Sequence, residues 1–149
     1  GPRTDGAAAI SETKFLEPSD TFSQSENGAR EETRMTLFIK PISANAMYRV
    51  CNRTIHISSD GREFKKTMLD LLTRTPHGFI RGPVKLRLDF EFTTKRKRDL
   101  DNYAKPLIDS LKNILFEDDS EIYALHMTKR IGAAADCIRI ECDPVYDDD

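Results

Sequence analysis

The chain has 149 residues, a net charge of -2 and 38% hydrophobic residues. This length suits one folded domain, and no apolar run approaches the roughly 20 residues that a membrane-spanning helix needs. The three cysteines, Cys51, Cys137 and Cys142, are odd in number and lack the C-x-x-C spacing of a zinc knuckle or a redox pair. We therefore expect reduced thiols in an intracellular protein, cytoplasmic or nucleoid-associated, that has no membrane partner.

Charge divides the chain into three parts. Residues 1–35 carry four basic and seven acidic residues, and residues 143–149 add four aspartates and no base. Residues 36–142 keep nineteen basic and fourteen acidic residues, which gives a net charge of +5. A basic body of this kind can attract a polyanion even though the whole chain is slightly acidic.

The ends of the chain also differ from the middle in composition. Residues 1–35 are rich in Ala, Ser, Glu, Thr and Gly and show neither a helical nor a strand period, which predicts a disordered N-terminal arm. The opening Gly1-Pro2 is typical of a protease-tag scar. We expect the folded domain at residues 36–142 and an acidic C-terminal tail at residues 143–149.

The first half of the expected domain contains two extended segments and a helix. Residues 36–40 predict a short strand, residues 43–45 a polar loop, and residues 48–57 an irregular extended ribbon. Asp60 offers an N-cap for a helix that continues to about Arg74. The apolar face of this helix consists of Phe64, Met68, Leu71 and Leu72.

The second half contains the clearest strand pattern. Residues 84–92 alternate between apolar and charged side chains, as a strand with one covered face requires. Apolar residues then recur at helical spacing up to Leu115, but Pro106 lacks an N–H, so the regular helix begins late or its first turn is bent. Residues 121–129 and 137–142 predict two more strands, joined by a turn rich in Gly and Ala.

The chemistry-bearing residues gather before and within this helix. Four cations, Lys95 to Arg98, directly precede Asp99 and Asp101, whose side chains share one side if the backbone is extended. Lys105 and Asp109 follow Asp101 at helical spacing. A pair of carboxylates, Asp118 and Asp119, comes after Leu115, where a chain reversal can return them towards the start of the helix.

These residue types fit phosphodiester hydrolysis. Mg²⁺, or Mn²⁺ in its place, needs only two or three carboxylates and keeps waters that a substrate phosphate can displace. The ion would polarise the phosphoryl oxygen and activate a water. Lys105 would neutralise charge that develops in the transition state or hold the attacking water, and the basic run would contact neighbouring phosphates.

Simpler interpretations of the same residues remain open at this point. A D-x-D pair in a chain with 25 acidic residues is a weak metal signal by itself. Asp99 or Asp101 also suits a helix cap, and Asp101 with Lys105 suits an exposed ion pair of small energetic value. A Lys-Arg run is usually a solvated loop, or a nuclear address if the source is eukaryotic.

Longer strings carry a family resemblance. The string RDLDNYAKPLIDSL at residues 98–111, followed by DDSEI at residues 118–122, resembles the RusA family of Holliday-junction resolvases, which are crossover junction endodeoxyribonucleases. Upstream, KPISANAMYR at residues 40–49 is similar to the Pro/Ser/Asn-rich segment of that family. The resemblance covers nearly all of residues 36–142 and leaves the arm and the tail without a counterpart.

The resemblance implies a small α/β (α+β) domain with a mixed sheet of about four strands and helices, acting as a homodimer that nicks symmetric strands of a four-way junction. By position, Asp99, Asp101 and Asp119 match metal-binding aspartates, with Asp118 as an additional candidate ligand, and Lys105 matches a catalytic lysine. Asp109 matches a recurring position of unassigned role. The residues expected to bind DNA are Lys95, Arg96, Lys97, Arg98, Asn45, Tyr48 and Arg49.

Two departures from the family pattern concern substrate grip more than metal chemistry. The loop at residues 112–117 is short, and Ala44 and Ala46 stand where polar residues are common in the family. Our leading hypothesis is a Mg²⁺-dependent junction resolvase that acts in DNA recombination, repair or replication. The alternatives are a nuclease for flaps, forks or single strands, and a non-catalytic protein that binds branched DNA.

Overall fold

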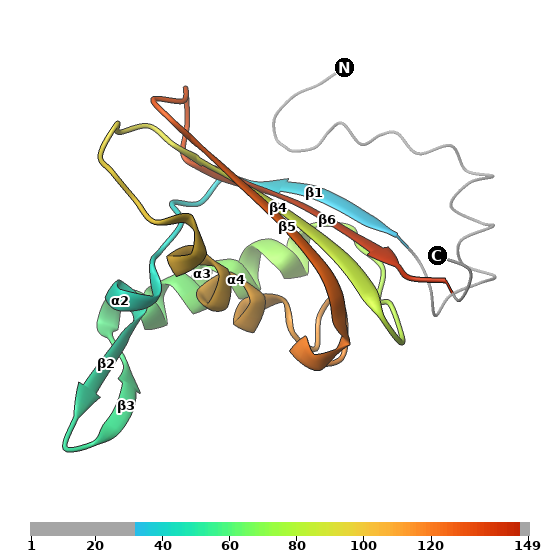
Figure 1. The fold of residues 1–149 in the computed structure, drawn as a ribbon, viewed down its shortest axis with the longest axis horizontal. Helices are drawn as coiled ribbons and strands as arrows, with labels where there is room; N and C mark the ends of the chain where they lie inside the picture. The colour runs from blue at the N-terminus through green and yellow to red at the C-terminus, as the bar shows by residue number, and fades with distance from the viewer. Residues whose placement is uncertain (1–31, 147–149) are drawn as a thin grey trace.

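The computed structural model describes residues 32–146, which form a four-stranded sheet, a separate two-stranded hairpin and helices on one face of the sheet (Figure 1). The strands are β1 (Thr33–Leu37), β2 (Tyr48–Cys51), β3 (Thr54–Ile57), β4 (Val84–Phe92), β5 (Ile122–Ile131) and β6 (Cys137–Pro144). The helices are α2 (Ala44–Met47), α3 (Ser59–Arg74) and α4 (Ala104–Leu111), with two 3₁₀ helices, η2 (Leu100–Tyr103) and η3 (Asp119–Glu121). None of these helices is long and apolar enough to cross a membrane.

The four-stranded sheet has the order β1-β6-β4-β5. β6 pairs antiparallel with both β1 and β4, whereas β5 runs parallel to β4. The expected fold class, an α/β domain with a mixed sheet of about four strands, is confirmed. Because parallel neighbours cannot be joined by a tight turn, the chain between β4 and β5 crosses over one face of the sheet.

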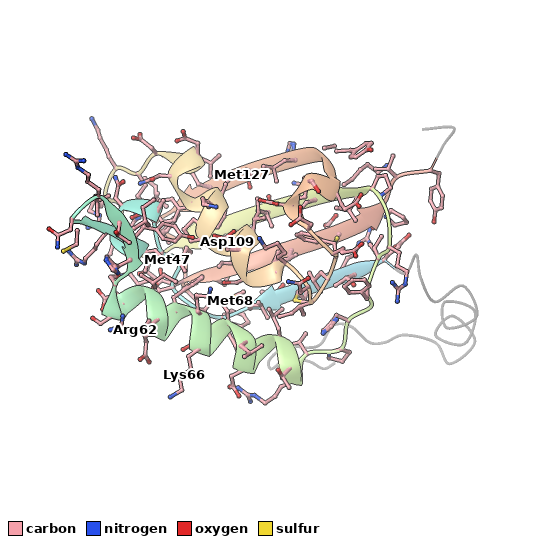
Figure 2. All side chains as sticks on the ribbon, turned by 90° about the horizontal axis from the view of Figure 1, so that it is seen from below. Met47, Arg62, Lys66, Met68, Asp109 and Met127 are labelled. Carbon is pink, nitrogen blue, oxygen red and sulfur yellow. The ribbon has the colours of Figure 1, made fainter. Side chains whose placement is uncertain are left out.

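The core lies between the sheet and the helices. β4 alternates between buried and exposed residues as its sequence pattern predicts, with Leu88 and Phe90 only 0% and 1% exposed. α4 adds Leu107 and Leu111 to the same core. Figure 2 shows α3 and α4 in front of the sheet, with Lys66 on the outer side of α3. Each fully buried Leu or Phe contributes about 1.5 to 3 kcal/mol, so apolar burial holds α4 in place.

The folded region extends beyond the expected bounds at both ends. β1 begins at Thr33, so three residues of the expected arm, Thr33 to Met35, pair with β6. β6 continues through Asp143 and Pro144, so the start of the expected tail belongs to the sheet. The rest of the arm and tail, residues 1–31 and 147–149, lies outside the described residues.

The segment before α3 differs from its expected structure in two places. Ser58, not Asp60, caps α3, because its hydroxyl accepts a hydrogen bond from the Gly61 N–H at 2.9 Å. The expected polar loop at residues 43–45 is the start of α2, which Ser43 caps by accepting from the Ala46 N–H at 3.1 Å. A helix of four residues is too short to show an apolar period in the sequence.

The expected ribbon at residues 48–57 is a regular hairpin that extends away from the sheet (Figure 1). Asn52 and Arg53 form its turn with φ angles of 52° and 65°, the left-handed region that tight hairpin turns require. Val50 and Ile55 pair near its tip and are 76% and 68% exposed. Its root continues from α2, which contacts both α3 and α4, so the hairpin is anchored beside the crossover.

The three cysteines are free, as expected. Cys51 is exposed, whereas Cys137 and Cys142 are buried in β6. Burial is the largest cause that raises the pKa of Cys137 to about 11 and that of Cys142 to about 12. Both buried thiols therefore stay protonated at neutral pH and pack as small apolar side chains.

Candidate active site in the crossover

The crossover between β4 and β5, residues 93–121, carries all the aspartates and the lysine expected to do chemistry. In chain order it consists of a basic loop (Lys95 to Arg98), η2, α4 and η3. It runs along the helix-covered face of the sheet, between the end of β4 and the start of β5 (Figure 1). One connection on a packed sheet therefore positions all of these side chains relative to one another.

Within the basic loop, the fourth cation is different from the other three. Lys95, Arg96 and Lys97 are exposed, but Arg98 is buried, at 9% exposure. Its guanidinium lies 4.0 Å from the centroid of the Phe92 ring and donates to the carbonyl of Arg96 at 2.9 Å. It also donates to the Thr94 hydroxyl. These contacts point to a role of Arg98 in shaping the loop, while the exposed three remain the candidates for phosphate contact.

Replacing Arg98 with alanine is expected to destabilise the fold by about 1 to 3 kcal/mol, because the change removes a cation–π contact and leaves loop carbonyls without a donor. Urea unfolding of Arg98→Ala beside Lys97→Ala measures this difference. The exposed Lys97 serves as the matched control and is expected to change stability by less than about 0.5 kcal/mol. Equal stability of the two variants would show that Arg98 does not brace the loop.

Asp99 and Asp101 lie at the start of η2. Asp99 has an extended backbone with φ -87° and ψ 118°, but Asp101 lies within the 3₁₀ helix. The condition under which both side chains share one side, an extended backbone, therefore does not hold at Asp101. Both residues are exposed, and neither carboxylate bonds to another group among residues 32–146. Both side chains are thus available to a cation or a water.

α4 begins at Ala104, directly after η2, as the position of Pro106 predicts. Lys105 and Asp109 on α4 line an open cleft of 460 Å³ together with Asp119, the first residue of η3. The other wall of this cleft is the start of β5, with Ile122 and Leu125. The cleft therefore combines the expected catalytic lysine with one expected metal-binding aspartate.

A chain of contacts links the α4 wall of this cleft to the hairpin root. The Lys105 ammonium lies 3.5 Å from Oδ2 of Asp109. The hydroxyl of Tyr48 donates to the same oxygen at 2.6 Å. Burial raises the pKa of Tyr48, and the hydrogen bond to Asp109 raises it further, so the hydroxyl stays protonated as a donor at neutral pH.

The two adjacent aspartates of the second acidic segment have different surroundings. Asp118 caps η3, because its carboxylate accepts from the Ser120 N–H at 3.1 Å. Its second oxygen lies 3.9 Å from the Lys112 ammonium. The hydrogen bond with Ser120 is the largest cause that lowers the pKa of Asp118. Asp118 is thus engaged in a cap, while Asp119 lines the cleft with Lys105.

The expected metal ligands do not form a closed set in this geometry. Within residues 32–146, no group of three or more His, Cys, Asp or Glu side chains converges closely enough to hold an ion. The donor chemistry nevertheless fits Mg²⁺, which takes carboxylate oxygens and is commonly held by one or two carboxylates with waters and substrate phosphates completing the shell. Asp99, Asp101 and Asp119 are exposed carboxylates of this kind.

The other residues expected to bind DNA lie at the hairpin. Asn45 and Arg49 are exposed, on α2 and β2 respectively, whereas Tyr48 is half-buried and bonded to Asp109. Sequence reasoning missed Arg53, an exposed cation in the hairpin turn. It also missed Lys129, which donates from β5 to the carbonyl of Arg98 and fixes the loop where the aspartates begin.

Residues 39–142 match the model of the family described as endodeoxyribonuclease RusA. The matched region contains the whole crossover, the hairpin, the strands β4 and β5, and β6 up to Cys142. The few residues of β1 and the two ends of the chain lie outside it. The match thus covers every residue of the candidate active site.

Individual relatives agree with this match. The crossover junction endodeoxyribonuclease RusA of Shigella sonnei (strain Ss046) is 29% identical over 91 residues, which cover 60% of this chain and 76% of that protein. The protein of the same name from Escherichia coli (strain K12) is 28% identical over the same length and shares. That of Enterobacteria phage HK97 is 28% identical over 82 residues, or 54% of this chain and 68% of that protein. This chain belongs to the RusA family of endodeoxyribonucleases.

Proposed function

We propose that the protein is a Mg²⁺-dependent endodeoxyribonuclease that resolves four-way DNA junctions by paired symmetric nicks, and that Mn²⁺ can replace Mg²⁺. The observation that carries the proposal is the cleft that Lys105 and Asp119 both line, in a connection that begins with exposed cations. The names of the relatives supply the junction as substrate. Because four-way DNA junctions arise inside the cell, the protein would act there, in DNA recombination, repair or replication.

Each group of residues has a separate role in this reaction, which we assign from its surroundings in the structure. Asp99, Asp101 and Asp119 would hold the metal, which supplies a Lewis acid and an activated water for attack on the phosphate. The Lys105 ammonium stabilises negative charge that develops on the phosphoryl oxygens. Three exposed cations of the basic loop, together with Arg49, contact flanking phosphates and fix the register of the strand without reading bases.

Paired cuts need two active sites in one assembly, which a symmetric dimer provides. β5 is the candidate contact surface, because it lies at one edge of the sheet and, within residues 32–146, pairs only with β4. Tyr123, Leu125 and Ile131 of β5 are 69%, 44% and 44% exposed. An edge strand with exposed apolar side chains can pair with another chain, and we propose that this chain is a second copy of the protein.

A labelled synthetic four-way junction, a fork, a flap and a linear duplex of the same sequences test the proposal. With Mg²⁺ or Mn²⁺, the purified protein is expected to nick the junction at symmetric positions and to leave the duplex intact, while EDTA abolishes cleavage. Asp101→Asn serves as the inactive control for contaminating nucleases. Mass measurement in solution is expected to give a dimer that Ile131→Lys, a change outside the lining of the cleft, weakens.

Other outcomes of this experiment would sink the proposal. Equal cleavage of forks, flaps and junctions would make the protein a general structure-selective nuclease. Metal-independent binding of junctions without cleavage in any divalent ion would make it a binding protein. A strict monomer that still makes paired cuts would show that cleavage does not need a dimer.

A further inference from the structure

Tyr48 connects the hairpin to the catalytic helix although 61 positions separate it from Asp109 in the chain. Its hydroxyl donates to Oδ2 of Asp109 at 2.6 Å, and the Lys105 ammonium lies 3.5 Å from that same oxygen. One carboxylate oxygen therefore joins a phenol from β2 to a lysine on α4. Figure 2 labels Asp109 on α4 beside Met47 of α2, the residue that precedes Tyr48.

Lys105 needs such support to act at a defined place. Its side chain is 66% exposed, so water competes for the ammonium and four rotatable bonds let it move. An exposed lysine–carboxylate pair by itself contributes little. Asp109, however, is only 19% exposed, and the bond from Tyr48 fixes the oxygen to which the ammonium is drawn. The acceptor is thus held more firmly than the lysine.

The position of Tyr48 is in turn fixed by the root of the hairpin. Met47, the residue before it, is completely buried between α2 and the core. Ser58, on the other side of the hairpin, donates from its N–H to the Met47 carbonyl at 2.8 Å and from its hydroxyl to the Ala46 carbonyl at 2.7 Å. The root thus ties the end of α2 to the start of α3, and Tyr48 leaves it in a set direction.

We propose that Tyr48 and Asp109 are positioning residues that hold the Lys105 ammonium over the cleft where the phosphate is cut. This inference rests on the proposed nuclease function, in which Lys105 touches the reacting phosphate. It assigns Tyr48 to the orientation of the lysine rather than to DNA contact, and it gives Asp109 a role. The hairpin and the catalytic lysine then behave as one unit.

Tyr48→Phe keeps the ring and removes only the donor. The single-turnover rate of junction cleavage is expected to fall about tenfold, since small misplacement of a catalytic group is costly. Junction affinity measured in Ca²⁺ is expected to stay within about twofold, because no phosphate contact is lost. Asp109→Asn is expected to behave in the same way, and Asp70→Asn, an exposed aspartate paired with Arg74 on α3, is its matched control.

Combination with Lys105→Ala separates positioning from general damage. If Tyr48 acts through the lysine, Tyr48→Phe is expected to change the residual rate of Lys105→Ala by less than about twofold. A full tenfold loss in that background, or a loss of junction affinity equal to the loss of rate, would overturn the inference. Equal rates of wild type and Tyr48→Phe would do so as well.

A second measurement does not depend on cleavage. Lysines reductively methylated with ¹³C keep their charge and give separate NMR signals, and the signal lost in Lys105→Arg identifies Lys105. This signal is expected to move in Tyr48→Phe and to stay unchanged in Asp70→Asn. A moved signal in a protein that fails to cleave junctions would support the Tyr48–Asp109–Lys105 unit while refuting the proposed function. An unmoved signal in an active enzyme would refute the unit alone.

Discussion

Replacement of Asp119 with asparagine is expected to lower the rate of junction cleavage about a thousandfold. A metal ligand supports several kcal/mol of transition-state stabilisation, and each factor of ten in rate corresponds to about 1.4 kcal/mol. Asp119 lines the cleft beside Lys105, where such a ligand must stand. Single-turnover cleavage of a four-way junction at several Mg²⁺ concentrations measures the effect, and binding of the same junction in Ca²⁺ shows whether the substrate is still held.

The neighbouring Asp118 provides the matched control. Its carboxylate caps η3 by accepting from the Ser120 N–H, so Asp118→Asn is expected to lower the rate less than about tenfold. Asparagine is itself a good cap, which keeps η3 in place. A larger loss for Asp118→Asn than for Asp119→Asn would reverse the assignment of the two residues.

Gly61→Val is expected to reduce the free energy of unfolding by about 3 kcal/mol, the upper range for overpacking a tight contact. A Cβ atom at Gly61 would lie 2.8 Å from the Met47 carbonyl oxygen and 2.8 Å from Cγ2 of Ile57. The carbonyl belongs to the backbone and cannot rotate away, so α2 or the hairpin root has to move. Urea unfolding of the variant and of the wild type measures the loss.

Glu63→Val separates this clash from the lower helix propensity of valine. Glu63 is an exposed residue in the same turn region of α3, and its replacement is expected to cost less than about 1 kcal/mol. Because the hairpin root carries Tyr48, Gly61→Val is also expected to slow junction cleavage under conditions where the protein remains folded. Equal stabilities of the two variants would contradict the close packing at Gly61.

The parts of the fold that the sequence predicts are those with a strong local period. The alternation of β4 and the apolar stripe of α3 predict nearly the full length of both elements, and Pro106 predicts the late start of α4. The cap of α3 was misplaced because Asp60 and Ser58 are both good capping residues. What selects Ser58 is its second bond, to the Ala46 carbonyl, which depends on the packing of α2.

The site was predictable in its residue types and less so in its arrangement. A run of four cations looks uniform in the sequence. Only the contact with the Phe92 ring in the folded structure shows that Arg98 is buried. The geometry of Asp101 depends on a 3₁₀ turn that no apolar period reveals. The bond between Tyr48 and Asp109 joins two distant elements, so no local pattern could indicate it.

The pairing of β1 with β6 determines when the sheet can form during synthesis of the chain. β1 is the first strand of the described fold, and its only partner in the sheet is the last one. A chain growing from the ribosome therefore carries β1 without a partner until β6 has emerged, and contacts between such distant segments form slowly. Synthesis has to run almost to the end of the described residues before the sheet can close.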